Sequence, residues 1–303
     1  MSSTRIDLYQ TVTDQIIAAL EAGTPPWICP WSGGGTDQNP ANLSSGKAYR
    51  GINVLLLNLQ SMVKGYHHNR WLTFLQAQQL GGRIKRGEQG TQIVFFKMHE
   101  VRDAKVDSGQ SVSDADARVV PLLRSFTVFN VDQIDGLPPA LCTPVSVDPQ
   151  WSSIDHAEQL LTQSGAVLRH GGDRAFYTPT LDFIQMPGRS SFASAADYYA
   201  TALHELTHWT SHPTRCNRTL GKRHEINAYA FEELVAEMGA AFLTNHCRIE
   251  GRLQHASYIA SWLHALKNDR RLIFTAASQA QRAADFLLQV LEPLPKIALA
   301  QAA

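Results

Sequence analysis

Two histidines and a glutamate in the segment His204-Glu205-Leu206-Thr207-His208 are the residues best placed to do chemistry together. Residues four apart on a helix share one face and lie about 6 Å apart along its axis, so both imidazoles can reach one zinc ion. Glu205 projects beside the metal, where a carboxylate can take a proton from a water molecule. The segment therefore predicts a zinc-dependent peptidase site with Glu205 as the catalytic base.

The helix that must carry both histidines is predicted over 195–212. Ser194 is suited to cap its start, alanines favour its interior, and Pro213 prevents much extension. His212 continues the four-residue spacing, but it lies about 12 Å from His204 along the axis, too far for two zinc bonds of about 2 Å each. The third ligand must therefore come from elsewhere in the chain.

A carboxylate on the helix predicted over 228–246 can supply that ligand. Glu233 and Glu237 are four residues apart and share a helical face. We expect Glu233 to bind the metal and Glu237 to orient a ligating histidine through its other ring nitrogen, although the reverse assignment is also open. Zn²⁺ is the expected ion, and Mn²⁺ or another divalent ion could occupy the same two-histidine, one-carboxylate site.

Composition limits the class of protein. The chain has 303 residues, 44% of them hydrophobic, which is enough for two domains that each bury a core. The four cysteines form no Cys-x-x-Cys pair, which disfavours a disulfide framework and a thiolate zinc site. No secretion signal opens the chain, and no run approaches the roughly 18 apolar residues of a membrane helix. We expect a cytoplasmic protein with no membrane partner.

Four prolines between residues 137 and 150 indicate a linker, which divides the chain into predicted domains 1–146 and 147–303. The elements predicted for the first domain are helices over 6–20, 52–62 and 73–80, strands over 91–97 and 124–130, and a polar loop over 100–118.

The second domain is predicted to place a small sheet against long helices. Its elements are a helix over 154–162, strands over 166–169, 175–178 and 182–186, and helices over 195–212, 228–246, 257–267 and 276–291. This order predicts an α+β fold in which a mixed α/β domain precedes a domain whose sheet backs the helical metal site. The strand over 182–186 is expected to offer its edge to an extended peptide.

The first domain is locally basic and aromatic. Between residues 41 and 97 there are eight Lys and Arg residues and one acid, Glu88, an excess of seven. Lysine and arginine can follow phosphates while exposed rings stack on bases that a duplex covers, whereas the ordinary alternative is a solvated basic face over an aromatic core. The residues predicted to contact single-stranded DNA are Trp27, Trp31, Lys47, Tyr49, Arg50, Asn53, Arg70, Trp71, Arg83, Lys85 and Lys97. The phenylalanines that follow in the same aromatic series are Phe95, Phe96, Phe126 and Phe129.

Long strings in both halves resemble the ArdC family of plasmid antirestriction proteins, which is related to the N-terminal part of TraC-type plasmid primases. The resemblance covers nearly the whole chain and rests on Pro26-Trp27, Trp31 and residues 46–53, 70–73, 86–88, 204–210 and 232–237. It implies an N-terminal domain that binds single-stranded DNA and a C-terminal zincin-like metallopeptidase domain. It also implies protection of incoming plasmid DNA from host restriction during conjugation.

Carried over by position, His204 and His208 match the metal histidines of that family and Glu205 matches its catalytic acid. Two functions then compete. In the first, the protein binds DNA and its zinc domain cleaves a host protein, with or without DNA. In the second, the protein coats DNA while the metal only stabilises the fold. Priming of DNA synthesis is disfavoured, because the sequence shows no polymerase-type cluster of carboxylates.

Overall fold

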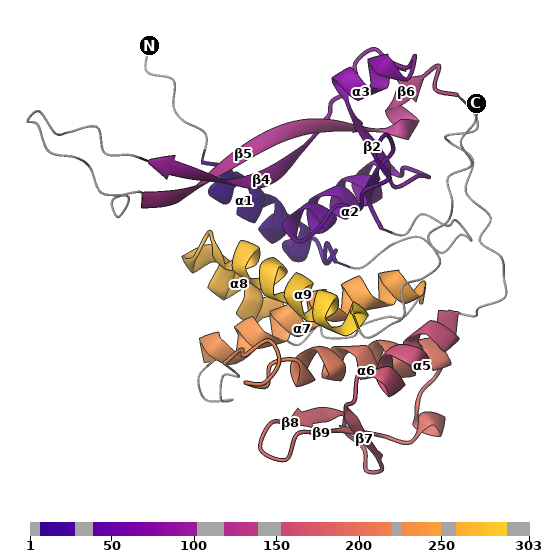
Figure 1. The fold of residues 1–303 in the computed structure, drawn as a ribbon, viewed down its shortest axis with the longest axis vertical. Coiled ribbons are helices and arrows are strands. Elements are labelled where there is room, and N and C mark those ends of the chain that lie inside the picture. The colour runs from indigo at the N-terminus through magenta and orange to yellow at the C-terminus, as the bar shows by residue number, and fades with distance from the viewer. Residues whose placement is uncertain are drawn as a thin grey trace, which may run out of the picture.

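The computed structural model of the protein describes residues 7–27, 39–101, 118–138, 153–219, 226–249 and 259–289, without the side chains of 97–101, 118–122, 153–154 and 226–227. A long two-stranded ribbon lies at one end of the molecule, a small three-stranded sheet lies at the other, and helices fill the space between them (Figure 1). The helices of the two halves of the chain therefore meet in the middle of the molecule.

The N-terminal half combines helices with a sheet of order β1-β2-β5-β4, in which β1 and β2 are parallel and the other pairs are antiparallel. Its elements are α1 (Leu8–Glu21), β1 (Ala41–Asn42), α2 (Ile52–Lys64), β2 (Arg70–Thr73), α3 (Phe74–Gln79), β3 (Arg83–Ile84), β4 (Thr91–Val101), β5 (Arg118–Asn130) and β6 (Ile134–Asp135). The strands β3 and β6 form a separate antiparallel pair. Mixed helix and sheet content, as predicted, is confirmed.

Local sequence explains where these helices start and stop. The side chain of Asp7 accepts bonds from the backbone of Tyr9 and Gln10 and so caps α1. Thr73 and Gln76 form the predicted capping box of α3. The predicted loop over 100–118 is shorter than expected because β4 and β5 pair as far as Val101 and Arg118, and residues 102–117 lie outside the described residues.

The C-terminal half places a three-stranded sheet against a layer of helices. Its elements are α5 (Ser153–Gln163), β7 (Val167–His170), β8 (Phe176–Thr178), β9 (Phe183–Met186), α6 (Ala195–Trp209), α7 (Ile226–Cys247), α8 (Ile259–Asn268) and α9 (Leu272–Leu288). The expectation that the strand over 182–186 offers a free edge is wrong. The sheet order is β7-β9-β8, so β9 is hydrogen-bonded on both sides.

None of the helices in the described residues is long and apolar enough to span a lipid bilayer. The apolar faces of these helices pack on one another instead. The largest hydrophobic cluster joins Ile16 of α1 and Leu55 of α2 to Leu203 of α6, Leu234 of α7 and Ile273 of α9. This cluster runs through both halves of the chain, and two smaller clusters, around Trp71 and around Leu72, belong to the N-terminal half alone.

Polar contacts reinforce the joint between the halves. The hydroxyl of Thr13 donates to the carbonyl of Arg270 at 2.8 Å, and the backbone N–H of Gly51 donates to Oε1 of Gln281 at 3.0 Å. The rings of Trp27 and Trp262 meet edge to face with centroids 5.5 Å apart. The predicted boundary at residues 146 and 147 falls in 139–152, outside the described residues.

The helices α6 and α7 approach closely at Gly239. A Cβ at that position would lie 2.5 Å from Cγ2 of Thr207, a separation that real Cβ atoms do not show. Since Thr207 precedes His208 and Gly239 lies on the same helix as Glu233, this contact sets the spacing between the residues predicted to bind metal. Only glycine permits the observed approach.

Gly239→Ala should push α6 and α7 apart and lower the free energy of unfolding by about 1–3 kcal/mol, less the gain of up to about 1 kcal/mol in helix propensity. Urea denaturation followed by circular dichroism measures the change. Gly188→Ala is the matched control, because its Cβ would meet no atom closer than 3.8 Å. Equal stability of the two variants would show that the glycine does not set the helix spacing.

Candidate metal centre

Three buried side chains from two helices converge on one point. His204 and His208 lie on α6 and Glu233 lies on α7, and one ligand atom from each falls within 4.8 Å of the others. Nε2 of His204 is 3.6 Å from Oε2 of Glu233, and Nε2 of His208 is 3.7 Å from Oε1 of the same carboxylate. The structure thus brings together the three residues that the sequence predicts as ligands.

The separations in this cluster suit a shared cation better than direct hydrogen bonds. Two ligands held about 2.0–2.2 Å from one ion in a tetrahedral arrangement are about 3.4 Å apart. The observed nitrogen–oxygen distances of 3.6 and 3.7 Å are close to that spacing and exceed the usual length of a hydrogen bond. Two imidazoles and one carboxylate are also a donor set that divalent transition ions accept. These residues therefore fit a divalent ion.

Buried negative charge dominates the electrostatics of the cluster. Burial alone lowers the pKa of His208, but the adjacent carboxylates of Glu232 and Glu233 and the charge of Glu205 raise it to about 10. Burial alone raises the pKa of Glu233, but the imidazoles of His204 and His208 that face it hold that pKa well below its usual range. The cluster therefore requires positive charge, whether on an imidazole or on a metal ion.

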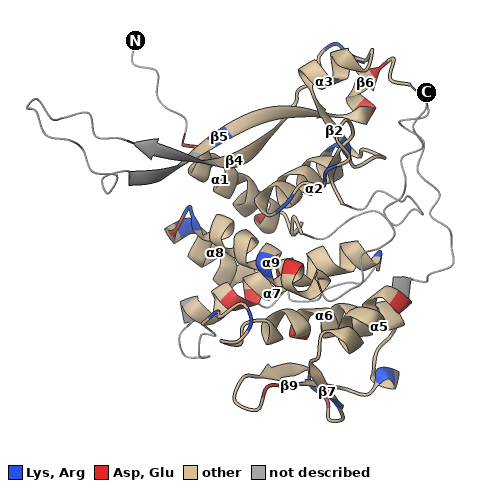
Figure 2. Ribbon diagram, in the orientation of Figure 1, with Lys and Arg blue, Asp and Glu red and all other residues tan. Residues whose placement is uncertain are grey.

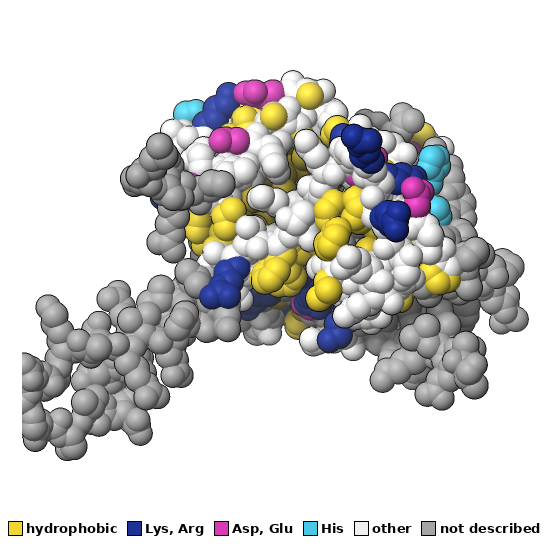
Figure 3. Space-filling view, turned by 90° about the horizontal axis from the view of Figure 1, so that it is seen from above, with side chains coloured by type: hydrophobic (Ala, Val, Ile, Leu, Met, Phe, Trp, Pro, Cys, Tyr) yellow, Lys and Arg dark blue, Asp and Glu magenta, His cyan; other side chains and the backbone are white. Residues whose placement is uncertain are grey.

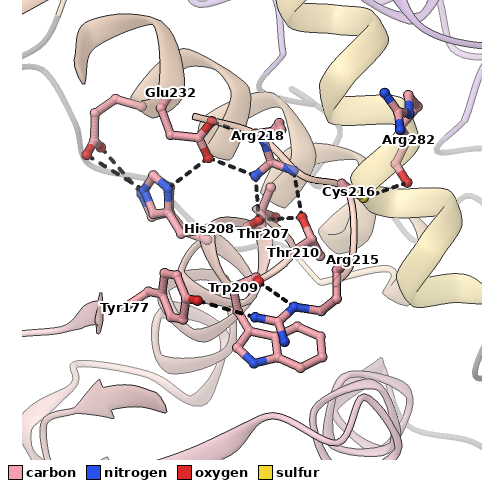
Figure 4. Close-up of polar contacts among 12 residues, drawn as sticks. Tyr177, Thr207, His208, Trp209, Thr210, Arg215, Cys216, Arg218, Glu232 and Arg282 are labelled. Atoms are coloured by element: carbon pink, nitrogen blue, oxygen red, sulfur yellow. Dashed lines mark hydrogen bonds and ion pairs between the residues drawn. The ribbon is translucent and has the colours of Figure 1, made fainter. Parts of the chain in front are cut away.

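A second carboxylate orients His208 from the opposite side of the ring. Nδ1 of His208 lies 3.3 Å from Oε1 of Glu232 (Figure 4). The other ring nitrogen, Nε2, lies 3.7 Å from Oε1 of Glu233. Arg218 fixes Glu232 with two bonds, from Nε at 3.0 Å and from Nη2 at 2.7 Å. Burial raises the pKa of Glu232, but bonds from His208 and Arg218 lower it overall. Such a partner holds a metal-binding histidine in one orientation.

Arg218 also anchors the loop that follows α6. Its guanidinium donates to Oγ1 of Thr210 at 2.7 Å and to the carbonyl of Thr207 at 2.8 Å (Figure 4). The side chains of Arg218 and Glu232 are each only 3% exposed. Neither residue was predicted to take part in the site. Glu232 stands beside Glu233 in the sequence, which is a weak indication, and no local pattern points to Arg218.

The remaining predictions for this site have mixed outcomes. Glu205 is buried next to His204 on α6, and its charge reaches His208. Glu232, rather than Glu237, is the carboxylate at Nδ1 of His208. Glu237 is buried one turn beyond Glu233, and its role in orienting a histidine stays a prediction.

Three of the residues predicted to contact DNA belong to the interior instead. Trp71 is 0% exposed and its ring nitrogen donates to Asn69, and Trp27 is 2% exposed against Trp262. Asn53 is buried and bonds to both the carbonyl and the N–H of Val94, which joins α2 to β4. Trp27 and Trp71 are therefore not available to stack on bases, and the polar atoms of Asn53 are already engaged in the fold, although Asn53 lines a cavity described below.

The other predicted DNA contacts are scattered. Arg70 donates to the carbonyl of Asn39, and Lys85 donates to the carbonyl of Asp132, while Arg83 is exposed on β3. Trp31 and the side chain of Lys97 lie outside the described residues. Four of the predicted residues line one cavity of about 980 Å³: Lys47, Tyr49, Arg50 and the buried Asn53. Burial of Tyr49 raises the pKa of its hydroxyl, which a bond from Asn42 partly offsets.

Comparison with known proteins identifies the family. Residues 6–129 match the N-terminal domain of the anti-restriction factor ArdC, and residues 155–279 match a zincin-like metallopeptidase domain. A metal-free crystal structure of the antirestriction ArdC protein from plasmid R388 is 42% identical, with a TM-score of 0.79, over 94% of this chain and 98% of that one. The chain belongs to the ArdC antirestriction family.

Other relatives extend the comparison. A Mn(II)-bound crystal structure of the same R388 protein matches with a TM-score of 0.74. This ArdC-family chain is 40% identical over 94% of its length to the uncharacterized protein y4eC of Sinorhizobium fredii (strain NBRC 101917 / NGR234), 92% of which it covers. Two Escherichia coli proteins named DNA primase TraC are 40% and 39% identical over 95% and 92% of this chain. It spans only 28% and 20% of their lengths.

Arg218→Met should destabilise the protein by about 3–5 kcal/mol, because it leaves the Glu232 carboxylate buried without its main cation. Replacing both residues by methionine should recover part of that loss, and urea denaturation measures all variants. Lys267→Met is the control, since Lys267 pairs with Glu21 where both side chains are about half exposed and such a pair contributes about 0–1 kcal/mol. A loss for Arg218→Met no larger than this control would contradict the assigned role.

Proposed function

We propose that this ArdC-family chain is an antirestriction protein that binds single-stranded DNA, protects incoming plasmid DNA during conjugation, and hydrolyses peptide bonds of a host protein in the cytoplasm. The observation that carries the peptidase proposal is the convergence of His204, His208 and Glu233 beside Glu205. That set supplies both a place for a divalent ion and a buried carboxylate next to it.

Each residue has a distinct role in the proposed hydrolysis. When bound, the divalent ion would polarise the scissile carbonyl and lower the pKa of a water molecule to about 7. His204, His208 and Glu233 would hold the ion, and Glu205 would accept the proton of the attacking water and pass it to the leaving amine as the peptide bond breaks. Arg218 and Glu232 keep the His208 ring in the orientation that presents Nε2.

Zn²⁺ is the metal we propose. At a site of two imidazoles and one carboxylate, affinity for Zn²⁺ generally exceeds affinity for Mn²⁺, so Mn²⁺ would require favourable availability. The R388 ArdC protein, 42% identical, has been crystallised with Mn(II), which keeps manganese as the alternative ion. The proposed activity needs only a divalent ion that acts as a Lewis acid.

DNA binding is the second proposed activity and rests on a separate observation. The cavity of about 980 Å³ in the N-terminal half is lined by exposed basic and aromatic side chains. Positive charge and exposed rings together suit single strands, whose bases are uncovered. The alternative is that coating DNA is sufficient for antirestriction. In that case the metal would only stabilise the fold.

Glu205→Gln should greatly slow peptide hydrolysis while leaving metal content unchanged, because Glu205 is not a ligand in the proposed set. Loss of a general base lowers the rate by about 10²–10⁴-fold. Cleavage of unfolded casein and metal analysis of the purified variant measure both quantities. His208→Ala is the contrasting variant and should lose metal. Full protection of a conjugated plasmid by Glu205→Gln in a restricting host would exclude a peptidase role in antirestriction.

Binding of the protein to a poly-dT oligonucleotide should weaken as salt rises, because lysine and arginine release cations condensed on the phosphates. For three phosphate contacts we expect log K to fall against log salt with a slope of about −2. Fluorescence anisotropy across a KCl series measures the slope, and potassium glutamate serves as the anion control. A slope near zero would contradict phosphate contacts.

A further inference from the structure

We propose that the cavity between the β4–β5 ribbon and α9 is a binding site for an unpaired base of single-stranded DNA, built by both halves of the chain. The inference rests on the proposed DNA binding and assigns it a place. The cavity, of about 980 Å³, is lined by the segment Lys47–Gly51, by the ribbon, and by Phe274, Ser278, Gln281 and Arg282 of α9. Its volume lies within the range of ligand pockets, about 300–1,000 Å³.

The aromatic wall of this cavity comes from the ribbon. Phe95 and Phe96 of β4 are 46% and 51% exposed, and Phe126 of β5 is 48% exposed. The rings of Phe95 and Phe126 meet edge to face with centroids 5.4 Å apart. Exposed phenylalanines grouped in this way are uncommon unless a surface binds something. A flat base stacked on either ring would cover apolar surface without needing a particular sequence.

Basic side chains surround the aromatic wall. The charged residues that line the cavity are Lys47, Arg50, Arg124, Arg282 and Asp285. Four are basic and one is acidic, which leaves an excess of three positive charges. On one broad face of the molecule, apolar side chains lie between Lys and Arg side chains (Figure 3). A polyanion with apolar bases matches this combination better than an acidic peptide does, since a peptide offers no row of flat rings to stack.

Contacts across the cavity hold its two sides in a fixed relation. Arg50 forms an ion pair with Asp285, and the N–H of Gly51 donates to Gln281, so the loop before α2 is tied to α9. Gly51 has a φ of 56°, and a Cβ there would lie 4.0 Å from the carbonyl of Ala277. The wall from the C-terminal half is therefore part of the site and not a separate body that happens to lie near it.

The test uses the full chain, a fluorescent poly-dT oligonucleotide and anisotropy at low salt. Phe95→Ala with Phe126→Ala should weaken binding by about 5- to 150-fold for each base that loses its stack. Arg282→Gln, on α9, should weaken binding several-fold and reduce the salt slope by about 0.7. The matched controls are Phe74→Ala and Lys64→Gln, whose side chains are exposed but line no part of the cavity. Unfolding midpoints confirm that each variant is folded.

Stacking has its own spectroscopic readout. A 2-aminopurine placed in the oligonucleotide should be quenched by the wild-type protein and less so by the double phenylalanine variant. Cavity variants that bind as tightly as the wild type would overturn this site while leaving the proposed DNA binding intact. A loss confined to the ribbon variants, with Arg282→Gln unchanged, would overturn the contribution of α9. A wild-type protein that binds no oligonucleotide at low salt would instead overturn the proposed function itself.

Discussion

Negative charge buried in the helical interior is the constraint on which the rest of the structure depends. Figure 2 marks acidic positions on α6 and α7, and the four glutamates Glu205, Glu232, Glu233 and Glu237 are all buried there. Ionised carboxylates are costly to remove from water, so each needs donors or a cation. Arg218 balances Glu232, and the histidines face Glu233. A divalent ion among these ligands would relieve the same imbalance, which ties metal binding to the stability of the fold.

The continuous core makes the two halves mechanically dependent. Helix α7 carries Glu233 and packs along α9, while α9 carries Arg282 and Asp285 on the wall of the N-terminal cavity. A packed interior resists small displacements, because shifts of its side chains create voids or clashes. The packing of α7 on α9 therefore positions the metal centre relative to the cavity, although no residue belongs to both sites. A cut between the halves would expose apolar faces of α1 and α2 that now lie in the shared core.

Periodicity and capping, which act within a few residues, allowed the sequence to predict most helices and strands and the site formed by His204, His208 and Glu233. Contacts between distant segments could not be predicted in the same way. Trp71 and Trp27 are as aromatic as any base-stacking residue, and only the packing against Asn69 and Trp262 shows that they are buried. Pairing with distant acids also lowers the positive charge that the N-terminal half presents to a ligand, so counting Lys and Arg in the sequence overestimated that charge. Arg50, for example, is paired with Asp285 from the far end of the chain.

Arg218 is a residue of this site that local sequence patterns do not reveal. It also shows that some residues here stabilise the fold without taking part in the proposed reaction. Its role depends on a loop that returns across α6 to reach Glu232 on α7, so no spacing in the sequence indicates it. Residues that hold the ligands, such as Arg218 and Glu232, contribute to folding whether or not the protein is a peptidase. Glu205 is not one of the proposed metal ligands. It is a further buried carboxylate beside them, and its charge raises the pKa of His208. The proposed ligands and their supporting residues could bind a metal for stability alone, whereas the general base is needed only for hydrolysis, so the peptidase proposal depends on Glu205 more than on the metal itself.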